Sequence, residues 1–341
     1  MTHNIAVIGA GVMGLASAVR ILENIPRVTV TVMADKFSPN TTSDGAAGLW
    51  EPYAPGNTPE HLQQRWGDAT FHHLEALLKT EESSEAGVTT VPSFHISNQP
   101  IQEPHYSKTV YNYRQVSTNE ISKIFPQAKH GIFFITILCE CRMYLPWLLK
   151  RFKKQGGRAI KRHISDLGEL AGQYDVIVNC AGLHARSLVN DESVHPIRGQ
   201  VIRVKAPWIR HFVDDYTSGC YIIPCANNVV LGGTLQKGSW NTQPDAEDKK
   251  RIFEDCCSVY PSLKHAEVDY DWVGLRPGRS SVRLEKEITQ VSGREMKIVH
   301  NYGHGGSGIT FHWGCAQDTT AFVAELLGEE VNFQEQPASK L

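Results

Sequence analysis

The feature that most constrains this fold is a strand, a glycine-rich turn and a helix that follow one another at the start of the chain. Residues 5–8 are continuously apolar, as in a strand buried on both faces of a parallel sheet. A G-x-G-x-x-G turn comes next at 9–14, followed by a helical stretch over about 15–24 and a second strand-like run over 28–33. This order predicts the first βαβ unit of an α/β, Rossmann-like domain.

The three glycines, Gly9, Gly11 and Gly14, have a specific use in such a unit. They let the backbone approach a pyrophosphate that lies on the positive N-terminus of the helix. Asp35 closes the second strand and is placed to accept hydrogen bonds from a ribose. A glycine turn that binds nothing is the alternative, but the strand, the helix and the acidic residue together favour a nucleotide site.

Later segments indicate that the nucleotide domain is dispersed along the chain. Residues 176–179 form another buried-strand run that ends in small residues. A glycine cluster at 303–308 precedes a predicted helix over 316–327. A short NAD domain usually runs through in one stretch, so a domain built from separated pieces favours the longer ligand, FAD.

The segments between these pieces give weaker signals. Residues 36–56 are rich in small and turn-forming residues and are predicted to form a functional loop. Pro59 is predicted to occupy the first position of a helix, and a second helix is expected over 146–154. Residues 86–137 and 198–235 are expected to be β-rich.

Composition excludes several classes of function. The formal net charge of -2 gives no electrostatic reason to bind nucleic acid or an anionic membrane, and no apolar run approaches the length of a membrane helix. The start of the chain has no room for a secretory signal, so the eight cysteines are expected to be mostly buried, reduced thiols.

Several blocks, taken together, resemble the D-amino-acid oxidase and D-aspartate oxidase family. They are the glycine turn with Asp35, the segments 41–50, 144–147, 176–182, 198–200 and 274–277, and the block 298–316. The resemblance covers essentially the whole chain in order. It implies a discontinuous Rossmann-like FAD-binding domain over 1–50, 145–195 and 285–335, with a β-rich substrate domain over 51–144 and 196–284.

The resemblance also implies cofactor contacts. Asp35 holds the ribose, and small polar residues face the phosphates. The full set of implied FAD contacts is Gly9, Gly11, Gly14, Asp35, Lys36, Thr41, Thr42, Ser43, Gly48, Leu49, Ile164, Ala181, Gly305, Gly306, Gly308, Ile309 and Thr310.

For the substrate, the resemblance implies that Arg276 forms a two-pronged ion pair with the carboxylate, assisted by the Tyr221 hydroxyl. The Gly306 carbonyl receives the amine, and Tyr53 lies nearby. No side chain is expected to act as acid or base, because hydride leaves the α-carbon directly for the flavin. Without the resemblance, the simplest interpretation is that Arg276 forms an ion pair at the surface and that Tyr221 is a tyrosine of the core. No metal is expected, since His300 and His304 lie on a glycine-rich turn.

The side-chain pocket is ambiguous. Where the aspartate-oxidase branch has two further arginines, this chain has Asp214 and Leu235, which cannot pair with an acidic side chain. Neutral or basic D-amino acids are therefore expected, with Asp214 or Glu51 favouring a cation. The alternatives are that both carboxylates are solvated loop groups, or that Arg210 or Arg279 replaces a lost arginine and D-aspartate is the substrate.

Two more distant functions remain open. A nicotinamide-dependent dehydrogenase would share the first glycine motif but not the block 298–316. A flavoprotein without catalysis would keep the cofactor motif but lose Arg276 or Tyr221, both of which are present. The resemblance also implies that, in the branch of the family that acts on neutral substrates, a tyrosine closes the active site. In this chain that residue is either Tyr216 or absent.

The tail, 336–341, ends in Ser339, Lys340 and Leu341, which match a peroxisomal import address read by a receptor. The expected partners are therefore a D-amino acid, oxygen and the import receptor, in the peroxisomal matrix. A homodimer is a further expectation.

Overall fold

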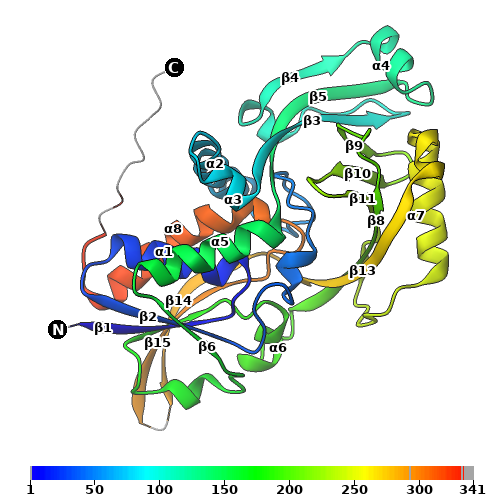
Figure 1. Ribbon diagram of the computed structural model, residues 1–341. Coiled ribbons are helices and arrows are strands. Elements are labelled where there is room, and N and C mark those ends of the chain that lie inside the picture. Colours follow the sequence, from blue (N-terminus) through cyan, green and yellow to red (C-terminus); the bar gives the residue numbers. More distant parts are fainter. Residues whose placement is uncertain (1, 292, 332, 334–341) are drawn as a thin grey trace.

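The computed structural model describes residues 2–291, 293–331 and 333, and these fold around two β-sheets (Figure 1). The strands of the first sheet are, in spatial order, β14 (Arg283–Val291), β15 (Arg294–Tyr302), β7 (Val176–Asn179), β1 (His3–Ile8), β2 (Val28–Ala34) and β6 (Arg158–Lys161). All neighbours pair in parallel except β14 and β15, which form an antiparallel hairpin. The sheet is thus the predicted Rossmann-like core, assembled from separated parts of the chain.

The second sheet is mostly antiparallel. Its strands are, in order, β12 (Gln236–Lys237), β8 (His195–Lys205), β11 (Val229–Gly232), β10 (Cys220–Pro224), β9 (Phe212–Asp215), β3 (Val88–Ser97), β5 (His130–Cys139) and β4 (Tyr111–Val116), while β13 (Glu267–Gly278) also pairs with β8. Only β3 and β9 run parallel. The expected β-rich segments therefore form one sheet.

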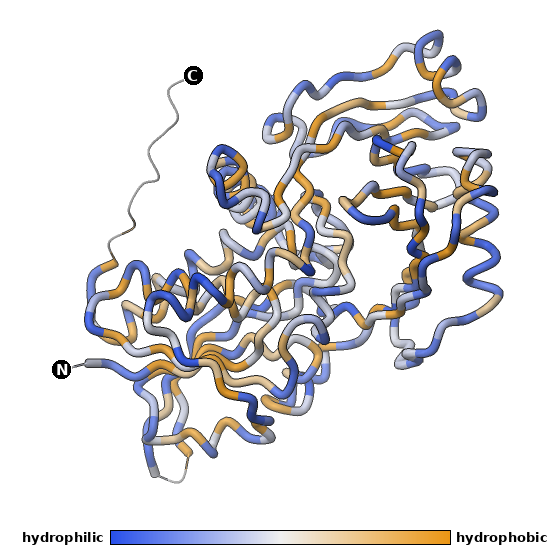
Figure 2. The backbone as a smooth tube through the Cα atoms, in the orientation of Figure 1, coloured by the Kyte–Doolittle hydropathy of each residue, from blue (hydrophilic) through white to orange (hydrophobic). Residues whose placement is uncertain are grey.

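Three long helices pack together on one face of the first sheet: α1 (Val12–Asn24), α5 (Cys141–Lys154) and α8 (Gly308–Leu327) (Figure 1). Figure 2 shows the hydrophobic strands of this sheet running beneath them. α7 (Ala246–Val259) covers β8, β10 and β11 of the second sheet. The short helices are α3 (Ser83–Ala86), α4 (Thr118–Ile124) and α6 (Ala185–Leu188).

α2 (Glu60–Leu78) lies in a segment expected in the substrate domain, yet it packs against α8 beside the first sheet. Its Trp66 and Phe71 belong to the same buried apolar cluster as Phe311 of α8. The sequence shows that this helix has an apolar face. It does not show which layer of the structure packs against that face.

Three helix starts differ from the sequence prediction. Pro59 stands at the cap of α2 rather than at its first helical position. α5 begins at Cys141, so that Pro146 lies inside it, because the buried Tyr144 and Leu145 hold this turn against the core. α8 begins at Gly308, directly after the glycine cluster, and residues 309–315, which precede the predicted start at 316, are helical and buried.

All eight cysteines are free thiols, and seven of them are buried, as expected. Among the described residues, no helix is both long enough and apolar enough to cross a membrane.

Candidate active site

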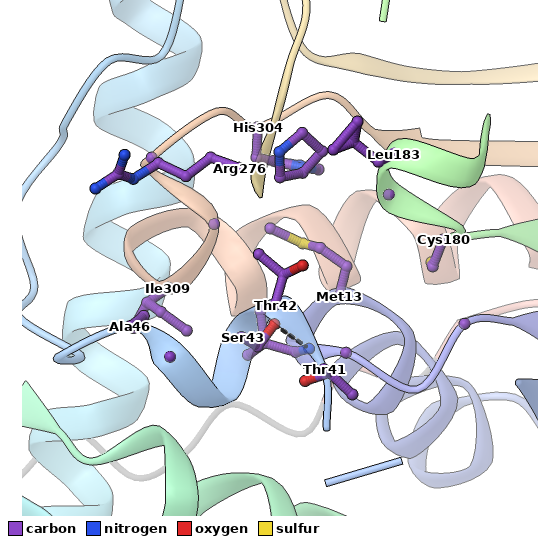
Figure 3. A pocket seen from close by; sticks show the side chains of 18 of the residues that line it. Met13, Thr41, Thr42, Ser43, Ala46, Cys180, Leu183, Arg276, His304 and Ile309 are labelled. Carbon is purple, nitrogen blue, oxygen red and sulfur yellow. Dashed lines mark hydrogen bonds between the residues drawn. The ribbon is translucent and has the colours of Figure 1, made fainter. Parts of the chain in front are cut away.

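One cavity of about 480 Å³ runs from the glycine turn after β1 to a face of the second sheet. Figure 3 shows Thr41, Thr42 and Ser43 beside the start of α1, with Arg276 on the other side of the cavity. The two sheets therefore contribute opposite ends of a single site.

Close backbone contacts shape the end of the cavity near α1. A Cβ atom on Gly14 would lie 1.9 Å from the carbonyl oxygen of Gly9, and one on Gly9 would lie 2.3 Å from that of Cys180. Gly11 caps the helix and has no side chain to accept a hydrogen bond, and the first turn carries no acidic residue. The first turn of α1 therefore offers an anion its positive end.

The loop after β2 is held against this turn by hydrogen bonds. Ser43 Oγ accepts a hydrogen bond of 3.1 Å from Val12 N. Asp44 accepts hydrogen bonds from the backbone and hydroxyl of Thr41 and from Ser38, at 2.9, 2.7 and 2.5 Å. Since Asp44 is buried, these bonds fix the hydroxyl-bearing turn next to the helix start.

The structure brings most of the sequence-predicted cofactor residues to this cavity. Those that line it are Gly9, Gly11, Asp35, Lys36, Thr41, Thr42, Ser43, Gly48, Leu49, Ile164, Ala181, Gly305, Gly306, Gly308 and Ile309. Gly14 and Thr310 lie behind the wall. Thr310 Oγ1 donates to the carbonyl of Glu51 at 2.6 Å and accepts from its N–H at 3.2 Å.

These features fit FAD. The open first turn of α1 suits a pyrophosphate, and Asp35 at the end of β2 suits a ribose. The cavity then continues between Gly48 and the glycine turn at 303–308 toward the second sheet. A shorter nucleotide would occupy only the first part of it.

The opposite end of the cavity is one face of the second sheet. Alternate residues of five neighbouring strands line it, as the two-residue period of a strand requires. They are Val201, Phe212, Asp214, Tyr221, Ile223, Val230, Trp272 and Arg276. Apart from Asp214, Tyr221 and Arg276 this face is apolar.

Tyr221 and Arg276 lie over glycines of the neighbouring strands. A Cβ on Gly232 would stand 2.1 Å from the Tyr221 ring, and one on Gly199 would stand 2.2 Å from the Arg276 guanidinium. Arg276 Nη1 also donates to the Thr234 carbonyl at 3.1 Å. The glycines leave just the space that these side chains occupy, so both are fixed facing the cavity.

Tyr53 completes this group. Its ring lies 5.6 Å from the Arg276 guanidinium, and its backbone N–H and carbonyl both bond Ser307 Oγ at 2.9 Å. Burial raises the pKa of Tyr53 to about 12 and also raises the pKa of Tyr221, although Arg276 lowers both. Both hydroxyls therefore stay protonated near neutral pH and can donate hydrogen bonds, beside a guanidinium, to a carboxylate.

A second polar group lies next to Tyr221. Asp214 is the cross-strand partner of Tyr221 on one side and of His95 on the other. His95 Nε2 lies 3.2 Å from Glu51 Oε1, and ligand atoms of Glu51, His95 and Asp214 lie within 4.8 Å of one another. The expectation that Glu51 and Asp214 are solvated loop carboxylates does not fit this arrangement, because both line the cavity and Asp214 belongs to β9.

The other residues considered for the side-chain pocket lie elsewhere. Leu235 is 52% exposed and does not line the cavity. Arg210 is exposed, and Arg279 is paired with Asp191 at 2.8 Å. Tyr216 is half exposed, and its hydroxyl lies 2.7 Å from His95 Nδ1. Neither Arg210 nor Arg279 therefore supplies the cavity with a cation in place of the arginines of the aspartate-oxidase branch.

Sequence reasoning missed His304 and Trp272. His304 lines the cavity, is buried, and has no hydrogen-bond partner for Nε2 among the described residues. Burial lowers its pKa to about 3, so the imidazole is neutral. Trp272 stands four residues before Arg276 on the same strand, so the two-residue period alone could have placed it on the same face.

Comparison with known proteins agrees with this geometry. The family model DAO, FAD dependent oxidoreductase, matches residues 4–322. Human D-aspartate oxidase is 45% identical over 326 residues, covering 95% of each chain. D-amino acid oxidase of Dugesia ryukyuensis is 38% identical over 330 residues, covering 95% of this chain and 98% of its own.

Among solved structures, glycine oxidase from Geobacillus kaustophilus superposes with a TM-score of 0.76 at 18% identity, over 96% of this chain and 95% of its own. This likeness shows the shared fold. With the family match over most of the length and the two relatives above, it leads to one conclusion: the chain belongs to the DAO family of FAD-dependent oxidoreductases.

Proposed function

We propose that this chain catalyses the oxidative deamination of D-amino acids with neutral or basic side chains. The observation that carries the proposal is the Arg276–Tyr221 pair, which is fixed over two glycines and lines the same cavity as Gly306. The names of the two relatives, D-aspartate oxidase and D-amino acid oxidase, support the D configuration.

The residues of the cavity bind and orient the substrate. Arg276 pairs with the α-carboxylate, since a guanidinium matches its two oxygens, and the protonated Tyr221 hydroxyl adds a donor. The Gly306 carbonyl accepts from the amine. A substrate held at both groups has a fixed orientation of its α-C–H bond, and catalysis is then mainly orientation and electrostatic positioning.

FAD supplies the two-electron acceptor for this reaction. In sum, the amino acid, dioxygen and water give a 2-oxo acid, ammonium and hydrogen peroxide. The amino acid loses two electrons and dioxygen gains them, while water supplies the carbonyl oxygen.

D-aspartate is the second candidate, because human D-aspartate oxidase is 45% identical to this chain. An acidic side chain needs a cationic partner. Of the cations among the described cavity-lining residues, Lys36 and Arg162 lie at the nucleotide end, and Arg276 is taken by the α-carboxylate. The neutral or basic class is therefore preferred.

The test is peroxide production by the purified, FAD-loaded protein on D-alanine, D-arginine, D-aspartate, D-glutamate and the L-enantiomers. Turnover of D-alanine or D-arginine, with little of D-aspartate, is expected. Turnover mainly of D-aspartate would support the proposed reaction but contradict the proposed preference for neutral or basic side chains. A flavin-loaded protein that oxidises no D-amino acid would reject the reaction itself.

We also propose that the protein works in the peroxisome, since the reaction releases peroxide and the chain carries Ser339, Lys340 and Leu341. These three residues lie outside the described part of the chain. Residues 330–341 fused to the C-terminus of a fluorescent protein should direct it to catalase-containing organelles, and the same fusion without 339–341 should remain diffuse.

The homodimer stays a prediction, which sedimentation velocity can check.

A further inference from the structure

The cluster of Glu51, His95 and Asp214 contains two carboxylates beside the substrate-binding group, and their surroundings differ. Glu51 Oε1 accepts a hydrogen bond of 2.7 Å from Tyr106 and lies 3.2 Å from His95 Nε2. The carboxylate of Asp214 has no hydrogen-bond partner among the described residues, although it lines the cavity.

The contacts of the cluster leave one carboxylate without a direct partner. Burial lowers the pKa of His95, but Glu51 and Asp214 outweigh this effect and hold it above its usual value. The close contacts of His95 and of the Tyr106 hydroxyl are both made to Glu51, at 3.2 and 2.7 Å. Asp214 is the carboxylate that remains for a ligand in the cavity.

The position of Asp214 matches the path of a substrate side chain. His95, Asp214 and Tyr221 are cross-strand partners in a row over β3, β9 and β10, so their side chains share one face. A substrate held through its carboxylate at Tyr221 and Arg276 has Asp214 as its neighbour toward β3. In the opposite direction, over β11, β8 and β13, the same face offers the apolar Val201 and Trp272.

We propose that Asp214 is a specificity-determining residue that binds a cationic group, ammonium or guanidinium, at the end of the substrate side chain. This inference rests on the proposed function and narrows its substrate class from neutral or basic to basic. It also assigns the binding of the cation to Asp214 rather than to Glu51, a choice that the sequence alone left open.

The electrostatics of the site support the assignment. Burial, followed by the neighbouring Glu51 and Asp215, raises the pKa of Asp214 to about 7, whereas His95 lowers it. The pKa of this half-buried carboxylate stays raised, so His95 compensates its charge only in part. A cation bound in the cavity favours the ionised form of Asp214, and the attraction is stronger than in open water because the carboxylate is partly shielded from solvent.

The experiment compares three D-amino acids of matched length: D-lysine, D-norleucine and D-2-aminoadipate, which end in a cation, a methyl group and an anion. Peroxide production by the FAD-loaded protein is measured with EDTA present, so that a stray metal ion does not occupy the carboxylates. The expected kcat/KM for D-lysine exceeds that for D-norleucine by about tenfold or more, with D-2-aminoadipate lowest.

Asp214→Asn keeps the size of the side chain and removes its charge. It should reduce kcat/KM for D-lysine by about tenfold or more while changing that for D-norleucine by less than about threefold. The matched control is Asp269→Asn, which removes the same charge from an exposed position outside the cavity and should leave the ratio unchanged. If the Asp214 variant does not fold, the substrate series on the unmodified protein still carries the test.

A binding series separates this inference from the reaction. The non-oxidisable acids 6-aminohexanoate, hexanoate and adipate are titrated against the flavin absorbance of the protein. Tightest binding of 6-aminohexanoate, lost in Asp214→Asn, supports a cation site even if no amino acid is oxidised. Preference for the neutral member in both series would overturn the inference and leave the proposed function intact as long as peroxide is formed. Preference for the acidic member would overturn the inference and also the neutral or basic substrate class, leaving only the oxidative deamination itself.

Discussion

At the scale of single residues, the family resemblance in the sequence named the groups expected to bind substrate but not their surroundings. Without the family resemblance, Arg276 would be interpreted as a surface ion-pair residue and Tyr221 as a tyrosine of the core. The tertiary structure shows both over glycines and facing one cavity. The glycine positions 199 and 232 are visible in the sequence, but which side chains they make room for depends on the pairing of strands far apart in the chain.

Arg276→Lys tests the carboxylate fork. Lysine keeps the charge but cannot bond both carboxylate oxygens in one plane, so kcat/KM should fall by about 30- to 100-fold while the flavin spectrum is unchanged. The measurement is steady-state peroxide production. Arg210→Lys, on an exposed side chain outside the cavity, is the control and should behave as the unmodified protein. Equal activity of the two variants would remove Arg276 from the site.

Asp214→Asn should also change how stability depends on pH. The pKa of Asp214 is about 7 in the folded protein and about 3.9 in an unfolded chain, so its ionisation opposes folding as the pH rises between these values. The free energy of unfolding of the variant should equal that of the unmodified protein near pH 4 and exceed it progressively up to about pH 7. Above pH 7 the gain should stay constant, at no more than about 4 kcal/mol.

Urea unfolding of both proteins at pH 5, 6, 7 and 8 measures this gain. Glu51, His95 and Asp215 interact with Asp214 and are present in both proteins. Because Asp214 also helps to raise the pKa of His95, the difference between the two proteins reports the ionisation of Asp214 together with its coupling to His95. Asp269→Asn should show no such trend. A gain that shrinks with rising pH would mean that Asp214 is paired in the folded state.

At the scale of elements, the hydrophobic periods located most strands and the long helices, whereas helix starts were misplaced. α8 begins at Gly308 rather than near residue 316, and α5 includes Pro146. In both helices, burial against neighbouring elements outweighs the local signals that would end or delay a helix. Such packing is not visible within a short window of sequence.

Gly14→Ala tests the contact between α1 and the turn after β1. Its Cβ would lie 1.9 Å from a backbone oxygen, so the helix start must shift and FAD affinity should fall by at least about tenfold. Flavin absorbance after dialysis measures the bound fraction. Gly67→Ala in α2, whose nearest contact would be 3.4 Å, is the matched helical control and should keep its flavin. Full retention of FAD by Gly14→Ala would contradict the assigned contact.

At the scale of the whole molecule, the cavity joins segments from the start, middle and end of the chain. The loop after β2, the small residues after β7 and the glycine turn before α8 all line it. A ligand in this cavity therefore adds contacts between parts that are far apart in the sequence.

Removal of FAD should consequently destabilise the whole protein. At a free FAD concentration of about 100 times Kd, binding adds about 2.7 kcal/mol, which corresponds to about 5 °C in Tm. FMN, which lacks the adenosine half, should stabilise less because it leaves the Asp35 end empty. Differential scanning calorimetry of the apoprotein with each flavin measures this, and equal shifts would contradict the extended site.

The sequence by itself determined the Rossmann-like core and the nucleotide turn, because these depend on short motifs and on local periodicity, while the carboxylate-binding role expected of Arg276 and Tyr221 came from the family resemblance. Only the tertiary structure decided what surrounds Asp214. Its neighbours His95 and Tyr221 come from different strands, and Glu51 comes from a loop fixed by Thr310 of α8. A carboxylate is solvated, paired or left available according to its neighbours in space, and those are set by the pairing of distant strands.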